Sequence, residues 1–281
     1  MGSVERCKKS FREKLKQENV VVNSLWIGNE LSNLELLTIH SFIAQGHTFR
    51  LWVYDMAFKN LPAKAELRNA AEIIPVEQVF SYKQKNKFGH GKGSYAGFSD
   101  IFRYKLLFEK GGWWVDMDVT CLKPLDFDAP YFFRTHHELN VVGNVMKCPA
   151  NSELMKACYD EAIANVDETN TDWHKPIQIL NNHIEKLQLS KYIQKNVSNP
   201  DKWEVTKKYV WSSLTPPAAW YFIHWQNEEW RTRKVSKNSF YFRSALGKLM
   251  EQYQLSKFPI SFMEKIKNRI NNNAAMTYLK K

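Results

Sequence analysis

Long apolar runs and paired cysteines are both missing from this sequence. No window approaches the roughly 18 consecutive apolar residues of a membrane-spanning helix. The basic N-terminus is not followed by the apolar stretch of a secretory signal. Met1-Gly2 does not begin a myristoylation site, because Arg6 stands where serine or threonine is required. The four cysteines form no C-x-x-C pair, which favours reduced thiols in a cytoplasmic protein.

Acidic residues are in the minority, and their distribution is uneven. The 281 residues include 40 Lys and Arg against 29 Asp and Glu, a net charge of +11. With 44% apolar and 14% aromatic residues the chain can fill a substantial core, which excludes intrinsic disorder, collagen and a small disulfide scaffold. This length is typical of one large domain or two small ones.

Most of the net charge lies in residues 231–281, which contain twelve Lys and Arg but only Glu251 and Glu264 as acids. Apolar residues recur there near helical spacing. Such a segment either packs its apolar stripe on the body of the protein or contacts an anionic lipid surface or nucleic acid. We expect a basic helical C-terminal segment, packed on the domain or facing a membrane or acceptor.

The pattern of residues 20–55 predicts strand, helix and strand. A lysine-rich helix over residues 1–19 precedes the first, β-branched strand at 20–27. Ser32 and Glu35 form a capping box, and the helix that they begin ends near Gly46. A second strand stops at Asp55. This βαβ unit predicts a mostly parallel sheet.

Ligands of such sheets collect at the carboxyl ends of the strands, so we expect Trp26–Gly28 and Asp55 near a nucleotide-sized crevice. The next stretch predicts a short helix at 63–71 and a Lys- and Gly-rich loop. The run GHGKGS in that loop lacks the spacing of a phosphate-binding loop, and no apolar strand leads into it. A mobile loop near the site is the favoured interpretation.

The densest signal is SDIFRYKLLFEKGGWWVDMDVTCLKPLDF, residues 99–127. Ser99 is predicted to cap a helix that carries Asp100 in its first turn and Arg103 on the same face. After Gly111 a strand is predicted over residues 113–119. Asp116 and Asp118 would then point the same way, and two such carboxylates repel each other unless a cation lies between them.

Three uses of this pair stay open at this point: a Mg²⁺ or Mn²⁺ site facing a diphosphate, acid–base chemistry on a glycoside, or a paired aspartyl site. A divalent ion whose shell substrate phosphates complete needs few protein ligands. A bare D-x-D is weak evidence. The helix, the two glycines and the apolar approach strengthen the functional interpretation.

The pattern S-D-x-x-R-Y-x-x-L-x-x-x-G-G-W-W-x-D-x-D resembles the signature of GT-A-fold glycosyltransferases, and is most similar to glycosyltransferase family 32 and its bacterial capsule and lipooligosaccharide relatives. GNVMKCPANSEL and IHWQNEEW extend the likeness over residues 20–230. The resemblance implies an α/β, GT-A type fold with a mostly parallel Rossmann-like sheet flanked by helices. It divides the chain into an N-terminal helix (1–19), a catalytic domain (20–230) and the basic segment (231–281).

The resemblance also implies roles for individual residues. Catalysis falls to Asp116, Asp118 and Arg103. Asp118, Asp116 and His224 hold the metal, Mn²⁺ or Mg²⁺. The donor-binding residues implied by the resemblance, together with a lysine that could neutralise diphosphate charge, are Trp26, Asp100, Arg103, Asp116, Asn144, Lys175 and Trp230, with Trp230 on a loop that closes over the donor. The chain departs from the pattern at Trp225, Glu229 and the segment DWHKPIQIL.

The implied activity is that of a hexosyltransferase (EC 2.4) in polysaccharide biosynthesis. A sugar would pass, with retention, from a nucleotide-sugar, most simply a UDP-sugar, to a hydroxyl of a glycan or lipid-linked glycan. We expect no nucleic acid partner and a cytoplasmic location, with peripheral contact at the inner face of the membrane through the basic C-terminus. Two rival hypotheses are a basic nucleic-acid-binding protein and a glycoside hydrolase that uses Asp116 and Asp118.

Overall fold

The first βαβ unit forms where the sequence predicts it. The computed structural model describes residues 20–255, beginning with strand β1 (Val21–Trp26), helix α2 (Asn33–Ala44) and strand β2 (Thr48–Val53). β1 and β2 run parallel. The carboxylate of Glu35 accepts the Ser32 backbone N–H at 2.9 Å, which confirms the capping box.

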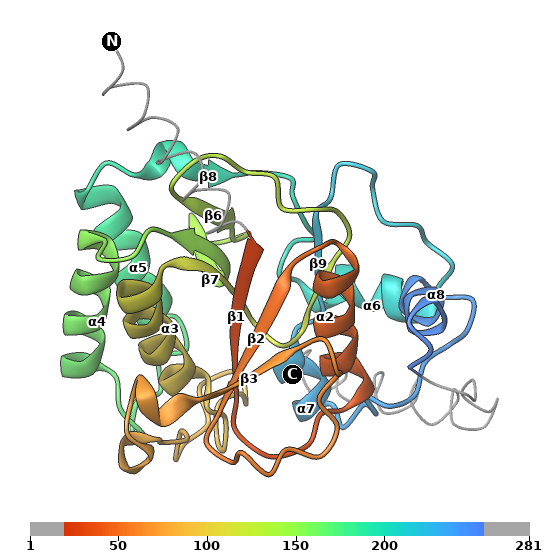
Figure 1. Ribbon diagram of the computed structural model, residues 1–281, viewed down its shortest axis with the longest axis horizontal. Helices are drawn as coiled ribbons and strands as arrows, with labels where there is room; N and C mark the ends of the chain where they lie inside the picture. The colour runs from red at the N-terminus through yellow and green to blue at the C-terminus, as the bar shows by residue number, and fades with distance from the viewer. Residues whose placement is uncertain (1–19, 256–281) are drawn as a thin grey trace.

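The central sheet has seven strands in the order β3-β2-β1-β4-β7-β6-β8 (Figure 1). Four of its six pairings are parallel, and β7 runs antiparallel to both of its neighbours. The remaining strands of the sheet are β3 (Glu66–Asn69), β4 (Gly112–Val115), β6 (Phe132–Thr135), β7 (Val141–Cys148) and β8 (Ile193–Gln194). A separate antiparallel pair joins β5 (Val119–Cys121) to β9 (Phe222–His224). The α/β class and the mixed, mostly parallel sheet are confirmed.

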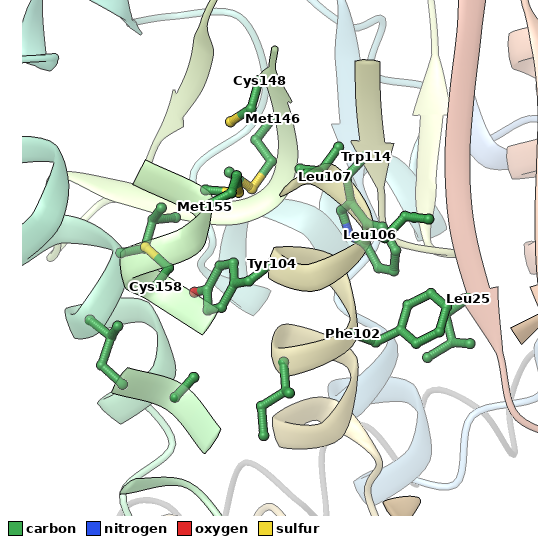
Figure 2. Packing of buried hydrophobic residues seen from close by; sticks show 14 of the residues in the cluster. Leu25, Phe102, Tyr104, Leu106, Leu107, Trp114, Met146, Cys148, Met155 and Cys158 are labelled. Carbon is green, nitrogen blue, oxygen red and sulfur yellow. The ribbon is translucent and has the colours of Figure 1, made fainter. Parts of the chain in front are cut away.

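Helices lie on both sides of the sheet (Figure 1). α3 (Ala96–Lys110), α4 (Glu153–Asn165) and α5 (Lys175–Lys186) pack on one side, and α2 lies on the other. Consecutive residues of a strand face opposite sides. Trp113 therefore belongs to the core under α2, and Trp114 to the core under α3. Figure 2 shows Tyr104 of α3 pointing toward Cys158, whereas Phe102 of the same helix lies beside Leu25.

A third core joins the later helices α6 (Trp203–Trp211), α7 (Asn227–Thr232) and α8 (Ala245–Gln252) to α2. Phe240, Leu246 and Met250 are buried in this core beside Leu34. The described part of the basic segment, up to residue 255, thus packs on the body of the protein. The expectations for residues 1–19 and for the tail beyond residue 255 lie outside the described residues.

Two local predictions are wrong around the dense signal. α3 begins at Ala96, not after Ser99, because burial of Phe98 (1% exposed) extends the helix toward its N-terminus. Asp100 therefore lies in the second turn. The strand predicted over 113–119 stops at Val115, and the chain turns at Asp116–Asp118 before β5 joins the separate strand pair. Carboxylates are costly inside a buried strand.

The helix predicted at 63–71 is also wrong. Residues Glu66–Asn69 form edge strand β3 beside β2, followed by the short 3₁₀ helix Ala70–Glu72. Cross-strand pairing with β2 overrides the local helical preference, and Glu66 bonds Arg50 of β2 at 2.8 Å. Cys121, Cys148 and Cys158 are free and buried, as the cysteine pattern predicts. Among residues 20–255, no helix has the length and apolar character needed to cross a lipid bilayer.

Candidate active site

A single cavity of about 1010 Å³ collects most of the residues that the sequence predicts. It opens at the carboxyl ends of β1 and β4, beside α3, the start of β7 and the end of β9. The predicted site residues that line it are Trp26, Asp100, Arg103, Asp116, Asp118, Asn144, His224 and Trp230. These residues come from segments more than 200 positions apart. The Lys- and Gly-rich loop also contributes lining residues, which confirms its place near the site.

Arg103 joins two of the predicted acids. Its Nη1 lies 2.7 Å from Asp100 Oδ1, and its Nη2 lies 2.8 Å from Asp116 Oδ1. The indole N–H of Trp114 donates to the same Asp116 oxygen at 2.7 Å. The guanidinium, 4% exposed, also lies over the Trp114 ring. The arginine fork is thus fixed, and its Nε–H has no hydrogen-bond partner in the part of the chain that the structure describes.

Burial sets the protonation of Asp100. It raises the pKa of the carboxyl from 3.8 to about 6, because the charge of Arg103 offsets only part of the desolvation and the Asp116 charge adds to it. Asp100 is therefore a carboxyl that ionises near neutral pH beside a permanent cation.

Asp118 has the geometry expected of a cation ligand. Its Oδ2 accepts the Asn227 backbone N–H at 2.5 Å and lies 3.2 Å from His224 Nε2. Its Oδ1 is buried and has no partner among the described residues. A buried carboxylate oxygen without a hydrogen bond is costly. Asp116 and Asp118 line the same cavity, so hard oxygen ligands suited to Mg²⁺ or Mn²⁺ are present, and the residues fit a divalent ion.

His224 lies between two carboxylates. Its Nε2 faces Asp118, and its Nδ1 lies 2.5 Å from Asp201 Oδ1. Burial works to lower the pKa of His224, but the charges of Asp118 and Asp201 outweigh it and raise that pKa to about 10. Burial works to raise the pKa of Asp118, and His224 brings it below the usual range.

Sequence reasoning missed Asp201 and Arg134. Arg134 of β6 is 1% exposed, and its Nη1 lies 2.9 and 2.8 Å from the two oxygens of Asp201. Burial works to raise the pKa of Asp201, but Arg134 and His224 hold it below the usual range. An arginine inside the apolar run YFFRT is an available signal, because a buried cation requires a partner. Nothing in the sequence identifies Asp201 as that partner.

Histidines form a second cluster in the cavity. His136, His137 and Asp201 bring possible ligand atoms within 4.8 Å of one another, so a His/His/Asp metal site is geometrically possible. His136 Nδ1, however, accepts the backbone N–H groups of Glu138 and Leu139, each at 3.1 Å. The proton of the neutral ring is then on Nε2, the nitrogen that faces Asp201. Asp201 is also already paired with Arg134. This cluster is therefore a less suitable cation site than the one at Asp118.

The remaining predicted residues differ in their placement. Trp26 ends β1 and donates from its indole N–H to the Glu30 carbonyl at 3.0 Å, with Lys237 Nζ 5.5 Å from its ring. Trp230 lies on α7 instead of on a loop. It is 1% exposed and donates to the Trp225 carbonyl at 2.7 Å. Lys175 begins α5 and does not line the cavity, whereas its neighbours Trp173 and His174 do.

The fold and the site together define an α/β enzyme whose cavity combines acids, a fixed arginine and ligands for a divalent ion. Residues 65–134 match a protein-family model described as a glycosyltransferase sugar-binding region containing a DXD motif. Asp100, Arg103 and the two aspartates of the turn all lie inside that segment. The protein is a glycosyltransferase (EC 2.4) with a DXD sugar-binding region, as its resemblance to family 32 implies.

Two solved structures are similar to the chain at low sequence identity. One is titled PaToxG glycosyltransferase, with a TM-score of 0.45, 14% identity, and coverage of 65% of this chain and 77% of the other. The second, a transferase mutant, has a TM-score of 0.41, 11% identity, and coverage of 64% and 92%. No curated relative matches the chain.

Proposed function

We propose that the protein transfers a sugar from a nucleotide-sugar, most simply a UDP-sugar, to a hydroxyl of a glycan or lipid-linked glycan, with retention of configuration. The observation that carries this proposal is that a single cavity contains Asp100, Arg103, Asp116, Asp118 and His224. Its volume, about 1010 Å³, is at the upper end of ligand pockets. That volume suits a reaction with two substrates.

Asp118, Asp116 and His224 would hold Mn²⁺ or Mg²⁺, with the unpartnered Asp118 Oδ1 as the leading ligand. When bound there, the ion neutralises the charge that develops on the leaving nucleoside diphosphate. The DXD motif implies such a divalent ion.

Arg103 is the protein's own cation at the reacting diphosphate. Its planar fork suits phosphate oxygens, and Asp100 with Asp116 fixes its direction before substrate arrives. Such preorganised charge lowers the barrier without reorganisation during the reaction. Asp100 would hold sugar hydroxyls. The side-chain amide nitrogen of Asn144 is buried and has no hydrogen-bond partner within residues 20–255, so it would be a donor for the sugar or the acceptor.

The carboxylates around the cavity support retention. In the described part of the chain, each one that lines the cavity has a cationic partner. These pairs are Asp100 and Asp116 with Arg103, Asp118 with His224, Asp201 with Arg134, Glu228 with Arg231, and Glu229 with Arg233. None of these carboxylates is therefore left unpaired to serve as a dedicated base for the acceptor. In a retaining transfer the departing phosphate oxygen takes the acceptor proton.

A thermal-shift screen of nucleotide-sugars, with and without Mn²⁺, tests the proposal. A ligand that binds the native state stabilises it by mass action, by about 2.7 kcal/mol at one hundred times its Kd. We expect a manganese-dependent rise in Tm with one class of nucleotide-sugar. Asp118→Ala should abolish that rise while the variant stays folded, as judged by circular dichroism.

Transfer to glycan acceptors, followed by mass spectrometry, then tests the reaction itself. Release of sugar from a polysaccharide without nucleotide donor would instead support the glycoside hydrolase. Manganese-independent nucleic acid binding without donor binding would support the nucleic-acid-binding protein. Wild-type donor turnover by both Asp118→Ala and Asp100→Asn would contradict the proposed site.

A further inference from the structure

The buried Asp201 lies behind the candidate cation site. It follows Asn199 and Pro200 in the chain and contacts the ring of His224 on the side away from Asp118. The side chain of Asp201 is 8% exposed and that of Arg134 is 1% exposed, so water has little access to either. The order of contacts is Arg134, Asp201, His224, Asp118. Only the last two are predicted metal ligands.

Arg134 fixes the Asp201 carboxylate in one orientation. Its Nη1 contacts both carboxylate oxygens, and its other nitrogens donate to Ser198 Oγ and the Asn199 carbonyl. Because the guanidinium is held on several sides, the carboxylate cannot turn without breaking charged hydrogen bonds in a buried setting. Such bonds are among the strong ones in proteins.

The residue two positions before Asp201, Asn199, hydrogen-bonds both backbone groups of His224. Asn199 Oδ1 accepts the His224 backbone N–H at 2.8 Å, and Asn199 Nδ2 donates to the His224 carbonyl at 2.9 Å. Asn199 thus fixes the position of His224, and Asp201 fixes the rotation of its ring.

This arrangement determines which ring nitrogen faces the cation site. A carboxylate held by arginine only accepts hydrogen bonds, so the imidazole nitrogen at 2.5 Å from it, Nδ1, carries a proton. Nε2 is then directed at Asp118, 3.2 Å from Oδ2. Histidine ligands of metals commonly donate their other N–H to a carboxylate, which fixes tautomer and orientation.

We propose that Asp201, locked by Arg134, is a positioning residue that orients His224 Nε2 toward the divalent cation held by Asp118. This inference rests on the proposed function, because it requires a cation at the DXD turn. A purely structural ion pair would stabilise the fold and leave cation binding unchanged. The distinction is therefore measurable.

The first test is Mn²⁺ binding to the full chain, followed by the electron paramagnetic resonance signal of free Mn²⁺. Substitution of such carboxylate partners typically weakens metal binding about 10–100-fold, and we expect a loss in this range for Asp201→Asn. In a His224→Ala background the same substitution should change the affinity less than about twofold, because coupled residues are not additive. Equal losses in both backgrounds would overturn the proposal.

The second test needs neither metal nor substrate. In ¹⁵N-histidine spectra of the wild-type protein, His224 should show a downfield proton on Nδ1, assigned by its absence in His224→Ala. Asp201→Asn should remove that signal and leave the signals of the histidines that lie outside the cavity unshifted. An unchanged signal would overturn the proposal. If Asp201→Asn does not fold, Asp201→Glu keeps the charge beside Arg134 and displaces the carboxylate, with the same losses expected.

Glu66→Gln is the matched control, because it removes a carboxylate from the Arg50 and Arg68 pairs outside the cavity. It should leave the Mn²⁺ affinity within about twofold of wild type. If Asp118→Ala abolishes Mn²⁺ binding while Asp201→Asn binds like wild type, the positioning role is wrong and the proposed function stands. If the wild-type protein binds neither Mn²⁺ nor Mg²⁺, both are wrong.

Discussion

At the scale of single residues, the site depends on close approach to Arg103. Gly143 begins the segment GNV on β7, directly against the guanidinium. A Cβ built at this glycine would lie 2.0 Å from Arg103 Nη1. Only glycine fits at this position, because any side chain would overlap the guanidinium that contacts both Asp100 and Asp116.

We predict that Gly143→Ala displaces the Arg103 fork. The added methyl group overlaps the guanidinium, and overpacking of this kind costs about 1–3 kcal/mol. Donor turnover should fall at least tenfold, measured as kcat/KM with the donor found in the screen. Ala162→Gly, a substitution inside α4 and away from the cavity, should lower stability by about 1 kcal/mol without changing kcat/KM. Wild-type turnover by Gly143→Ala would contradict the role of Arg103.

A second residue-scale prediction concerns pH. The pKa of Asp100 is raised to about 6 in the folded chain, so the folded state binds this proton more tightly than the unfolded state does. The ionised carboxylate therefore costs stability that is absent below about pH 4 and complete above about pH 6. Asp100→Asn mimics the protonated form. Relative to wild type it should gain up to about 3 kcal/mol between pH 4 and 7, measured by urea unfolding at each pH. A difference in unfolding free energy between the two proteins that does not change with pH would contradict the raised pKa of Asp100.

At the scale of elements, the Lys- and Gly-rich loop is tied to α7. The backbone N–H of Gly91 donates to Glu228 Oε1 at 2.9 Å, and Arg231 Nη1 donates to the Lys92 carbonyl at 2.9 Å. Both α7 residues also bond each other. The loop and α7 both line the cavity, so these contacts hold one wall of the site together.

We predict that Arg231→Ala loosens this wall more than it destabilises the protein. Exposed ion pairs contribute only about 0.2–1 kcal/mol, so Tm should change little. Hydrogen exchange at residues 86–93 should rise, and the KM for donor should increase several-fold. Lys156→Ala removes a comparable exposed pair with Asp160 on α4 and should leave both quantities unchanged. Unchanged exchange in Arg231→Ala would show that the loop is held by other contacts.

At the scale of the whole molecule, net charge is unevenly distributed along the sequence. Residues 231–281 carry +10 of the net +11. Basic residues close to a membrane are attracted to anionic lipid by about 1 kcal/mol each. If the acceptor is lipid-linked, as we propose, this attraction would bring the enzyme to the membrane that carries it.

We predict that deletion of residues 258–281, which removes five basic residues and one acid, reduces co-sedimentation with phosphatidylserine vesicles. The reduction should vanish at high salt, because screening removes surface attraction. Neutral vesicles serve as the control. Turnover of a soluble donor should stay at the wild-type level. Unchanged co-sedimentation after the deletion would remove membrane contact through the tail.

Local patterns sufficed wherever near neighbours decide the structure. The capping box at Ser32, the βαβ unit and the D-x-D motif were all predictable, because each depends on residues a few positions apart. Strand β3 at residues 66–69 and the break between β4 and β5 at Asp116–Asp118 were not, because pairing with β2 and β9 decides them. Asp201 could not be predicted for the same reason, since its partners Arg134 and His224 are 67 and 23 positions away.

The sequence by itself determined the class of the protein: an α/β chain with a glycosyltransferase motif, acids and an arginine at one end of a sheet. Only the tertiary structure decided which charged groups form ion pairs with one another. It joined Arg103 to both Asp100 and Asp116, placed His224 between Asp118 and Asp201, and put Lys175 outside the cavity. The physical reason is that local structure and motifs depend on residues a few positions apart in the sequence. The pairing of buried charges depends instead on which distant segments the folded core brings into contact.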